Sequence, residues 1–116
     1  MRPVLLALAT VSFVAGTASA QTQEQRYGFN AIERDDLAAA EARLDAARLE
    51  QPGEPSVLIN LAHVYWKTGR TDQAEAMYRQ VLAGQNVLML TGTHQQLWSH
   101  ALAQKGLDRA RQMASR

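Results

Sequence analysis

The feature that most constrains the fold of this chain is an internal repeat in its central part. Shifting the sequence by 34 residues places Ala40 on Ala74 and Leu44 on Tyr78. Self-similarity at a fixed period of this size is typical of proteins in which one small supersecondary unit stacks on copies of itself. Because a single unit cannot bury its own apolar face, the sequence predicts a stack whose core runs through successive units.

Composition and apolar spacing indicate that each unit is a pair of helices, since helix-favouring residues dominate the chain after residue 20. Residues 36–50 carry an apolar stripe at spacings of three and four, as one face of a helix does. That stripe consists of Leu37, Ala40, Leu44 and Ala47. A second helix is expected to start near Pro55 and to end at Gly69. We expect the side chain of Thr71 or Asp72 to cap a third helix.

The residues at the packing positions of these helices resemble those of a known family. The positions concerned are Leu61, Ala62, Tyr65, Ala74 and Tyr78. They stand where the tetratricopeptide repeat (TPR) has an apolar residue, a small residue, an aromatic, an alanine and a second aromatic. The resemblance implies an all-α fold, a short helix-turn-helix repeat array or TPR-like solenoid. In it, residues 21–86 form two TPR-like helix pairs, the first of them degenerate.

The N-terminal segment 1–20 has the features of a secretory signal peptide. Arg2 precedes an apolar run from about Val4 to Ala15, and Ala18-Ser19-Ala20 supplies small residues at a cleavage position. The alternative is an uncleaved membrane anchor, for which the apolar run is short. The sequence therefore predicts an exported, periplasmic protein with no membrane insertion after signal cleavage. The chain has no cysteine, so a lipid anchor on an N-terminal cysteine is excluded.

Residues 87–116 are expected to contain an apolar segment followed by degenerate C-terminal helices. In a damaged third unit, Trp98 and Gly106 would stand where Leu61 and Gly69 stand in the second, with a turn at Gly106. The apolar run Val87 to Leu90 leaves two alternatives: an extended segment packed on the last helices, or an exposed edge that awaits a partner. We favour packing in the core, because most short apolar runs end there.

The sequence shows no pattern of residues that would support catalysis. His94 and His100 are six residues apart, a spacing that places them on different sides of a helix. No HExxH motif, cysteine ligand or carboxylate pair accompanies them. Ser99 and His100 are adjacent in the chain and so do not face each other on a helix. We therefore predict no enzyme activity, no metal and no cofactor.

The charge balance also limits the class of partner. The chain has 12 Lys and Arg, one of them Arg2, against 11 Asp and Glu, so removal of residues 1–20 leaves no net charge. Binding of nucleic acid or of anionic lipid depends on clustered positive charge. We therefore expect a protein or peptide partner and no nucleic acid.

The resemblance also implies a binding surface, because tetratricopeptide arrays bind peptides or partner helices in a groove lined by the first helix of each pair. The groove positions of the family fall on Ser56, Ile59, His63, Trp66 and Lys67. Trp66 is the expected anchor, since an aromatic side chain offers a large contact area with few rotatable bonds. The alternative is that Trp66 and Trp98 are both buried against neighbouring helices.

Two functions are compatible with these features. The first is a non-catalytic interaction module, an exported TPR adaptor that binds a peptide or a partner protein through its groove. The second is a structural subunit that forms a homo-oligomer or docks onto a larger cell-envelope complex through Val87 to Leu90 and the terminal unit.

Overall fold

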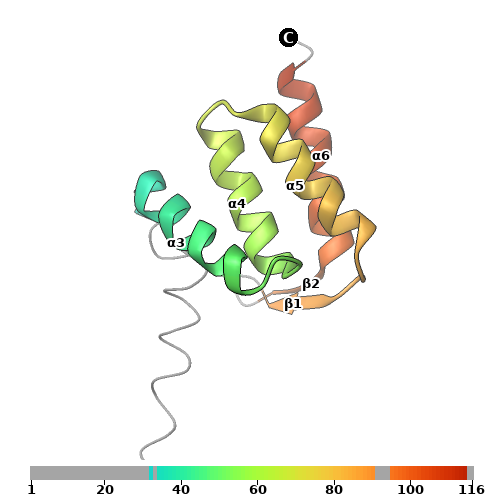
Figure 1. Ribbon diagram of the computed structural model, residues 1–116. Coiled ribbons are helices and arrows are strands. Elements are labelled where there is room, and N and C mark those ends of the chain that lie inside the picture. Colours follow the sequence, from blue (N-terminus) through green and yellow to red (C-terminus); the bar gives the residue numbers. More distant parts are fainter. Residues whose placement is uncertain (1–31, 33, 91–94, 115–116) are drawn as a thin grey trace, which may run out of the picture.

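The computed structural model describes residues 32, 34–90 and 95–114. Within them the chain forms α3 (Leu37–Glu50), α4 (Pro55–Lys67) and α5 (Thr71–Ala83), then the strands β1 (Leu88–Leu90) and β2 (Gln96–Trp98), and last α6 (Ser99–Ala114). The helices lie side by side in chain order, and the strands form a hairpin at one end of them (Figure 1). None of the described helices is long and apolar enough to span a bilayer.

Three consecutive helices, α3, α4 and α5, confirm the predicted helix-turn-helix array. The turn between α4 and α5 shows why the chain reverses there. Gly69 has φ 78°, in the left-handed region, and the amide of Arg70 donates to the carbonyl of Tyr65 at 2.8 Å. A left-handed residue just after a helix is the usual way to satisfy its last carbonyls. Gly69 therefore ends α4, as the sequence predicts.

The helix starts follow the sequence less closely. Asp36 caps α3, because its carboxylate accepts from the amide of Ala39 at 3.3 Å. Pro55 lies in the first turn of α4, where its missing N–H is not needed. The expected side-chain cap of α5 by Thr71 or Asp72 is wrong: the N-cap residue is Arg70, and no side chain caps the helix. The carboxylate of Asp72 still lies in the first turn, where the helix dipole favours negative charge.

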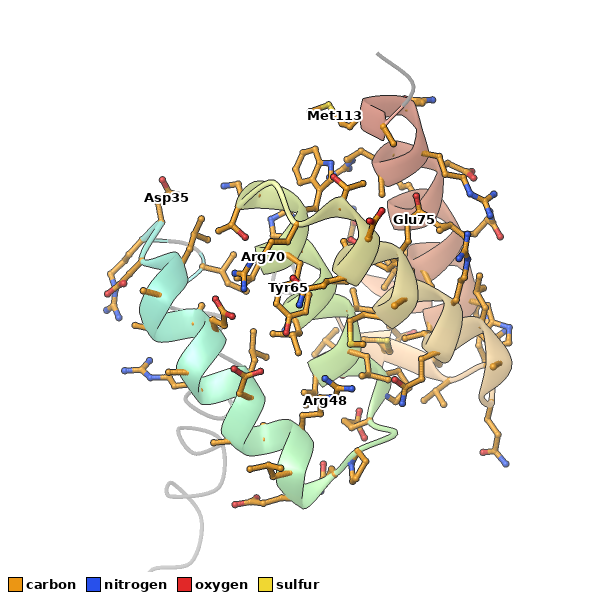
Figure 2. All side chains as sticks on the ribbon, turned by 45° about the horizontal axis from the view of Figure 1, so that its top comes forward. Asp35, Arg48, Tyr65, Arg70, Glu75 and Met113 are labelled. Atoms are coloured by element: carbon orange, nitrogen blue, oxygen red, sulfur yellow. The ribbon has the colours of Figure 1, made fainter. Side chains whose placement is uncertain are left out.

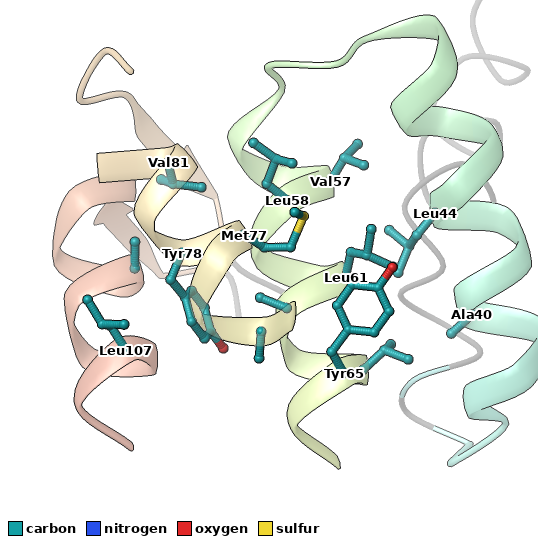
Figure 3. Packing of buried hydrophobic residues seen from close by; sticks show 14 of the residues in the cluster. Ala40, Leu44, Val57, Leu58, Leu61, Tyr65, Met77, Tyr78, Val81 and Leu107 are labelled. Atoms are coloured by element: carbon teal, nitrogen blue, oxygen red, sulfur yellow. The ribbon is translucent and has the colours of Figure 1, made fainter. Parts of the chain in front are cut away.

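One hydrophobic core runs through all four of these helices (Figure 3). Its larger side chains include Leu44 of α3, Leu58 and Leu61 of α4, Tyr78 of α5 and Leu107 of α6. The alanines of the repeat, Ala40 and Ala74, are completely buried. A methyl side chain at a contact allows two helices to approach closely, so the repeated alanine sets the helix spacing.

Residues 95–114 differ from the expected C-terminal helices, because a single uninterrupted helix, α6, runs from Ser99 to Ala114. The expected turn at Gly106 is therefore wrong. A Cβ at position 106 would collide with the ring of Tyr78. The glycine is needed for the close approach of α6 to α5 and not for a change of chain direction.

The apolar run before α6 also differs from the favoured expectation. Leu88 to Leu90 is extended, but it pairs with β2 in an antiparallel hairpin and does not enter the core. Leu88 is 48% exposed, Leu90 68% and Trp98 51%. Of the two alternatives, the structure therefore has the exposed edge.

Polar contacts close the base of the hairpin, where α5 ends and α6 begins. The amide of Ser99 donates to the carbonyl of Val87 at 2.8 Å, and the amide of Val87 donates to the hydroxyl of Ser99 at 2.9 Å. The amide of His100 donates to the side-chain oxygen of Asn86 at 3.1 Å. Ser99 is fully buried, so its hydroxyl is a structural group and has no access to a substrate.

Candidate partner-binding surface

The five predicted groove residues all lie on α4 and form what we call the α4 surface: Ser56, Ile59, His63, Trp66 and Lys67. The first four follow one another at spacings of three and four residues, so they share a face of the helix. These four are half-buried, whereas Lys67 is exposed. Ile59 and Trp66 also pack against the hydrophobic core, so the base of the α4 surface is rigidly supported.

Trp66 is the centre of this surface. Its ring lies 5.8 Å from the ring of His63, centroid to centroid, at an angle of 34°. From the neighbouring helix α6, the guanidinium carbon of Arg109 lies 4.9 Å from the centroid of the Trp66 ring. A cation over an indole face is attracted by the electron density of the ring. The indole of Trp66 thus contacts an imidazole of its own helix and a guanidinium of α6.

The indole N–H of Trp66 is buried and has no acceptor among the described residues. Such groups are uncommon, because a buried donor without a partner loses its hydrogen bond to water. The alternative that both tryptophans are buried is correct in part: Trp66 is half-buried, while Trp98 is 51% exposed.

The electrostatics of the α4 surface favour a neutral imidazole. Burial lowers the pKa of His63 below its ordinary value of 6.5, and the positive charges of Lys67 and Arg109 lower it further. Removing a charged group from water disfavours its charged form, and nearby charges of the same sign do so as well. The α4 surface and Arg109 together therefore combine the rings of His63 and Trp66 with the positive charges of Lys67 and Arg109.

Lys67 extends the α4 surface towards the start of α3. Its ammonium group lies 3.3 Å from a carboxylate oxygen of Asp35, which precedes that helix. Both side chains are substantially exposed, and such ion pairs contribute little to stability. The ion pair orients the side chain of Lys67 and adds little to the stability of the fold.

A separate contact fastens α3 to the turn between α4 and α5. The guanidinium of Arg70 donates to both carboxylate oxygens of Glu41, at 2.7 and 2.6 Å, and lies 4.6 Å from the centroid of the Tyr65 ring. Figure 2 shows Arg70 beside Tyr65, between α3 and α4. The hydrogen bonds from Arg70 lower the pKa of Glu41. Paired, planar geometry of this kind is the strong form of a carboxylate contact.

The sequence alone does not find two of these residues, Arg109 and Asp35. Arg109 is 43 positions after Trp66 and belongs to a helix that the sequence places in a damaged unit. One signal was available: if α6 takes the place of the first helix of the next unit, its side chains must line the same surface as those of α4. The structure confirms that α6 contacts both α5 and α4.

The segment that forms α3, α4 and α5 is similar to known proteins. Residues 31–86 match the family described as tetratricopeptide repeat. Residues 31–86 are therefore a tetratricopeptide repeat segment. The match covers α3, α4 and α5, and such repeats generally mediate contacts between proteins. In these terms, α4 and α5 form one repeat, α3 is the second helix of the preceding one, and α6 stands where the first helix of the next would be.

One relative of this tetratricopeptide chain is the cellulose synthase operon protein C of Xanthomonas axonopodis pv. citri (strain 306). The two sequences are 35% identical over 52 residues, which are 45% of this chain. The matched segment spans only 3% of the length of that relative. No solved structure gives a significant match.

Among the described residues, no group of three or more His, Cys, Asp or Glu side chains is placed to hold a metal ion. His63 lies on α4, whereas the imidazole of His100 is 2.9 Å from the carbonyl of Gly84 at the base of the hairpin. His94 lies outside the described residues. The charges that lower the pKa of His63 are the cations of Lys67 and Arg109, and no carboxylate contributes to this shift.

Proposed function

We propose that this chain is an exported tetratricopeptide adaptor that holds a peptide or a partner protein on the α4 surface and catalyses no reaction. The observation that carries the proposal is the setting of Trp66, whose indole lies against the ring of His63 and the guanidinium of Arg109. Tryptophan and arginine are the residue types that most often dominate the energy of protein interfaces. They do so where the surrounding residues exclude water, and Ile59 supplies apolar support here.

The physical argument concerns the cost of ordering a surface. Binding is weakened when flexible side chains must be fixed in place. On the α4 surface the anchor is already fixed, because Trp66 packs on the core from one side and contacts Arg109 from α6. Such a surface can bind a partner without a change of its own backbone.

Export is part of the proposal and rests on the sequence of residues 1–20, which lie outside the described residues. Cleavage after Ala20 would release the tetratricopeptide domain into the periplasm. Mass spectrometry of protein recovered from the periplasmic fraction is expected to show Gln21 at its N-terminus. A chain that stays in the cell with Met1 intact would contradict this part of the proposal.

The binding proposal is tested by selecting peptides from a random library on the purified protein. The affinity of the selected peptides is then measured by isothermal titration calorimetry. Trp66→Ala is expected to weaken binding at least about 30-fold, which corresponds to the loss of a hot spot of about 2 kcal/mol. Trp98→Ala is the matched control, because it removes the other tryptophan at an exposed position outside the α4 surface.

Two results would contradict the proposal. The first is a selection that yields no peptide with measurable affinity. The second is a peptide that binds Trp66→Ala as tightly as the unaltered protein. The circular dichroism melting curve of each variant separates a lost contact from a lost fold.

A further inference from the structure

Five of the seven large apolar side chains that are exposed among the described residues lie on the hairpin or next to it, outside the tetratricopeptide match. It is a two-stranded sheet, so each strand has a neighbouring strand on one side alone within the described part of the chain. A two-stranded sheet is marginally stable by itself in water. We call the outward side of Leu88–Leu90 the β1 edge. β1 lies along the lower rim of the molecule in Figure 1, with the helices above it.

Within the described residues, the β1 edge carries none of the charged side chains or prolines that usually protect an edge against pairing with another strand. Natural proteins guard exposed edges with charged side chains, with proline or with a covering loop. From Gln80 to Gln104 the sequence contains no Asp, Glu, Lys, Arg or Pro. The strands Leu88–Leu90 and Gln96–Trp98 contain no histidine either, so no like charges on the strands oppose the approach of an identical strand.

The hydrogen-bond pattern shows which backbone groups the β1 edge presents. The amide of Ser99 donates to the carbonyl of Val87, so the backbone polar groups of these two residues point towards the partner strand. Along an antiparallel strand, successive residues direct their N–H and C=O groups alternately towards and away from the partner strand. With Leu88 opposite Trp98 and Met89 opposite Leu97, the N–H and C=O groups of Met89 point towards β2, and those of Leu88 and Leu90 point away from it.

We propose that a second copy of this chain pairs with the β1 edge through its own β1, in antiparallel orientation around a two-fold axis at Met89. In that register Leu88 lies opposite Leu90 of the second copy, and Leu90 opposite its Leu88. The outward N–H and C=O groups of both residues then form two hydrogen-bonded pairs, one on each side of the axis. The result is a four-stranded sheet in the order β2, β1, β1 and β2.

The side chains of the hairpin are self-complementary in the same register. Leu88 and Leu90 share one face of the strand, and Trp98 lies opposite Leu88 on that face. All three are about half exposed or more. Pairing two copies joins them into one apolar strip across four strands, which buries surface that a single copy leaves in water. A two-fold contact uses the same patch twice and closes at a dimer.

A single introduced cysteine tests this register, because the chain has no cysteine of its own. Met89 would face Met89 of the second copy in a non-hydrogen-bonded pair, with Cα atoms about 4.5 Å apart. That separation is within the range of a disulfide. Met89→Cys is therefore expected to give a disulfide-linked dimer on air oxidation of the exported protein, seen on a non-reducing gel.

Leu97→Cys is the matched control. Leu97 lies opposite Met89 on the same face, but on β2, so its equivalents in the dimer are separated by three strand spacings, about 14 Å. It is expected to remain unlinked under the same conditions. Equal linking of both variants, or of neither, would overturn the proposal.

Sedimentation velocity over a dilution series tests whether the backbone edge makes the contact. Leu90→Pro removes an outward N–H and leaves the inward bonds of Met89 in place, a position at which edge strands tolerate proline. We expect it to raise the dimer dissociation constant at least about tenfold. Leu90→Val keeps the N–H and an apolar side chain and is expected to change it less than about threefold.

A protein that stays monomeric at every concentration would overturn the proposal. So would a dimer whose dissociation constant Leu90→Pro leaves unchanged. The outcome is independent of the α4 surface, because Trp66 lies on α4 and not on the hairpin. Trp66→Ala is expected to form the dimer as the unaltered protein does.

Discussion

Trp66 has a different position from that of a usual core aromatic, because one partner of its ring belongs to the same helix and the other to α6. The sequence identifies Trp66 and His63 from their spacing on α4. It does not identify Arg109, since the contact depends on how two helices cross and not on any local pattern. At the scale of residues, the side chains of one helix were predictable and their partners across the surface were not.

His63 should make the stability of the protein depend on pH. Its folded pKa is lowered from 6.5 by burial and by Lys67 and Arg109, so the unfolded chain takes up a proton at a higher pH than the folded one. Stability is therefore complete above about pH 6.5 and falls as the pH decreases from there towards the folded pKa. Urea unfolding at pH 7.5, 6.5 and 5.5 is expected to show this decrease, and His63→Gln should reduce it.

The comparison between the two proteins isolates the histidine, because the carboxylates are common to both. Measurements at pH 5.5 and above also stay above the pKa of Glu41, which lies below its ordinary value of 4.5. If His63→Gln loses stability with the same slope as the unaltered protein, His63 is not the titrating group.

Gly106 illustrates what the sequence can and cannot say about an element. A glycine after an apolar stripe can end a helix, as Gly69 does, or can allow a neighbouring helix to approach. Both uses depend on the absence of a Cβ atom, so the sequence alone does not distinguish between them. The helices around the repeated alanines were predictable from their apolar stripes, whereas α6 was predicted as two pieces because of this ambiguity.

Gly106→Ala should destabilise the contact between α5 and α6. The new methyl group would overlap the buried ring of Tyr78, which must move. Overpacking of this kind costs about 1–3 kcal/mol, and the higher helix propensity of alanine offsets roughly 1 kcal/mol of it. We expect a net loss of up to about 2 kcal/mol in the free energy of unfolding, measured with urea.

Gly53→Ala is the control for this substitution. A Cβ at Gly53 would have no atom within 4 Å, and Gly53 has no positive φ. The same chemical change there is expected to alter stability by less than about 0.5 kcal/mol. Equal losses of stability at both positions would indicate that the effect comes from replacing a glycine with alanine in general and not from the contact with Tyr78.

At the scale of the whole molecule, α3 to α6 share one core, so they should unfold as one unit. Leu44 and Leu107 are at opposite ends of that core, and both are buried. Leu44→Ala and Leu107→Ala are each expected to lower the free energy of unfolding by about 2–5 kcal/mol. Circular dichroism and Trp66 fluorescence, measured in a Trp98→Phe background, should give the same midpoint for each variant.

Separate midpoints would contradict a shared core. If Leu107→Ala released α6 and left the other helices folded, fluorescence would change before circular dichroism, because Arg109 lies on α6 beside Trp66. In arrays of repeats, cooperativity depends on the interfaces between neighbours.

The stacking of helices follows from the period of the sequence, because a helix pair with an exposed apolar face needs a neighbour. The hairpin does not follow from it. Val87 to Leu90 has the composition of a buried strand, and only the pairing with β2 beyond the intervening residues shows that its side chains remain outside the core. Whether these two neighbouring segments pair outside the core depends on how the rest of the chain packs, and the sequence of neither segment alone shows it.

The closed base of the hairpin has one more consequence. Val87 meets Ser99 and Asn86 meets His100, so the end of α5 and the start of α6 are joined directly, as if by a short turn. The strands β1 and β2 lie beyond those contacts and are not needed to connect α5 to α6. We expect that adding or removing residues there in pairs, which preserves the alternation of the strands, displaces neither helix. The same helical stack can therefore be carried by chains of different lengths.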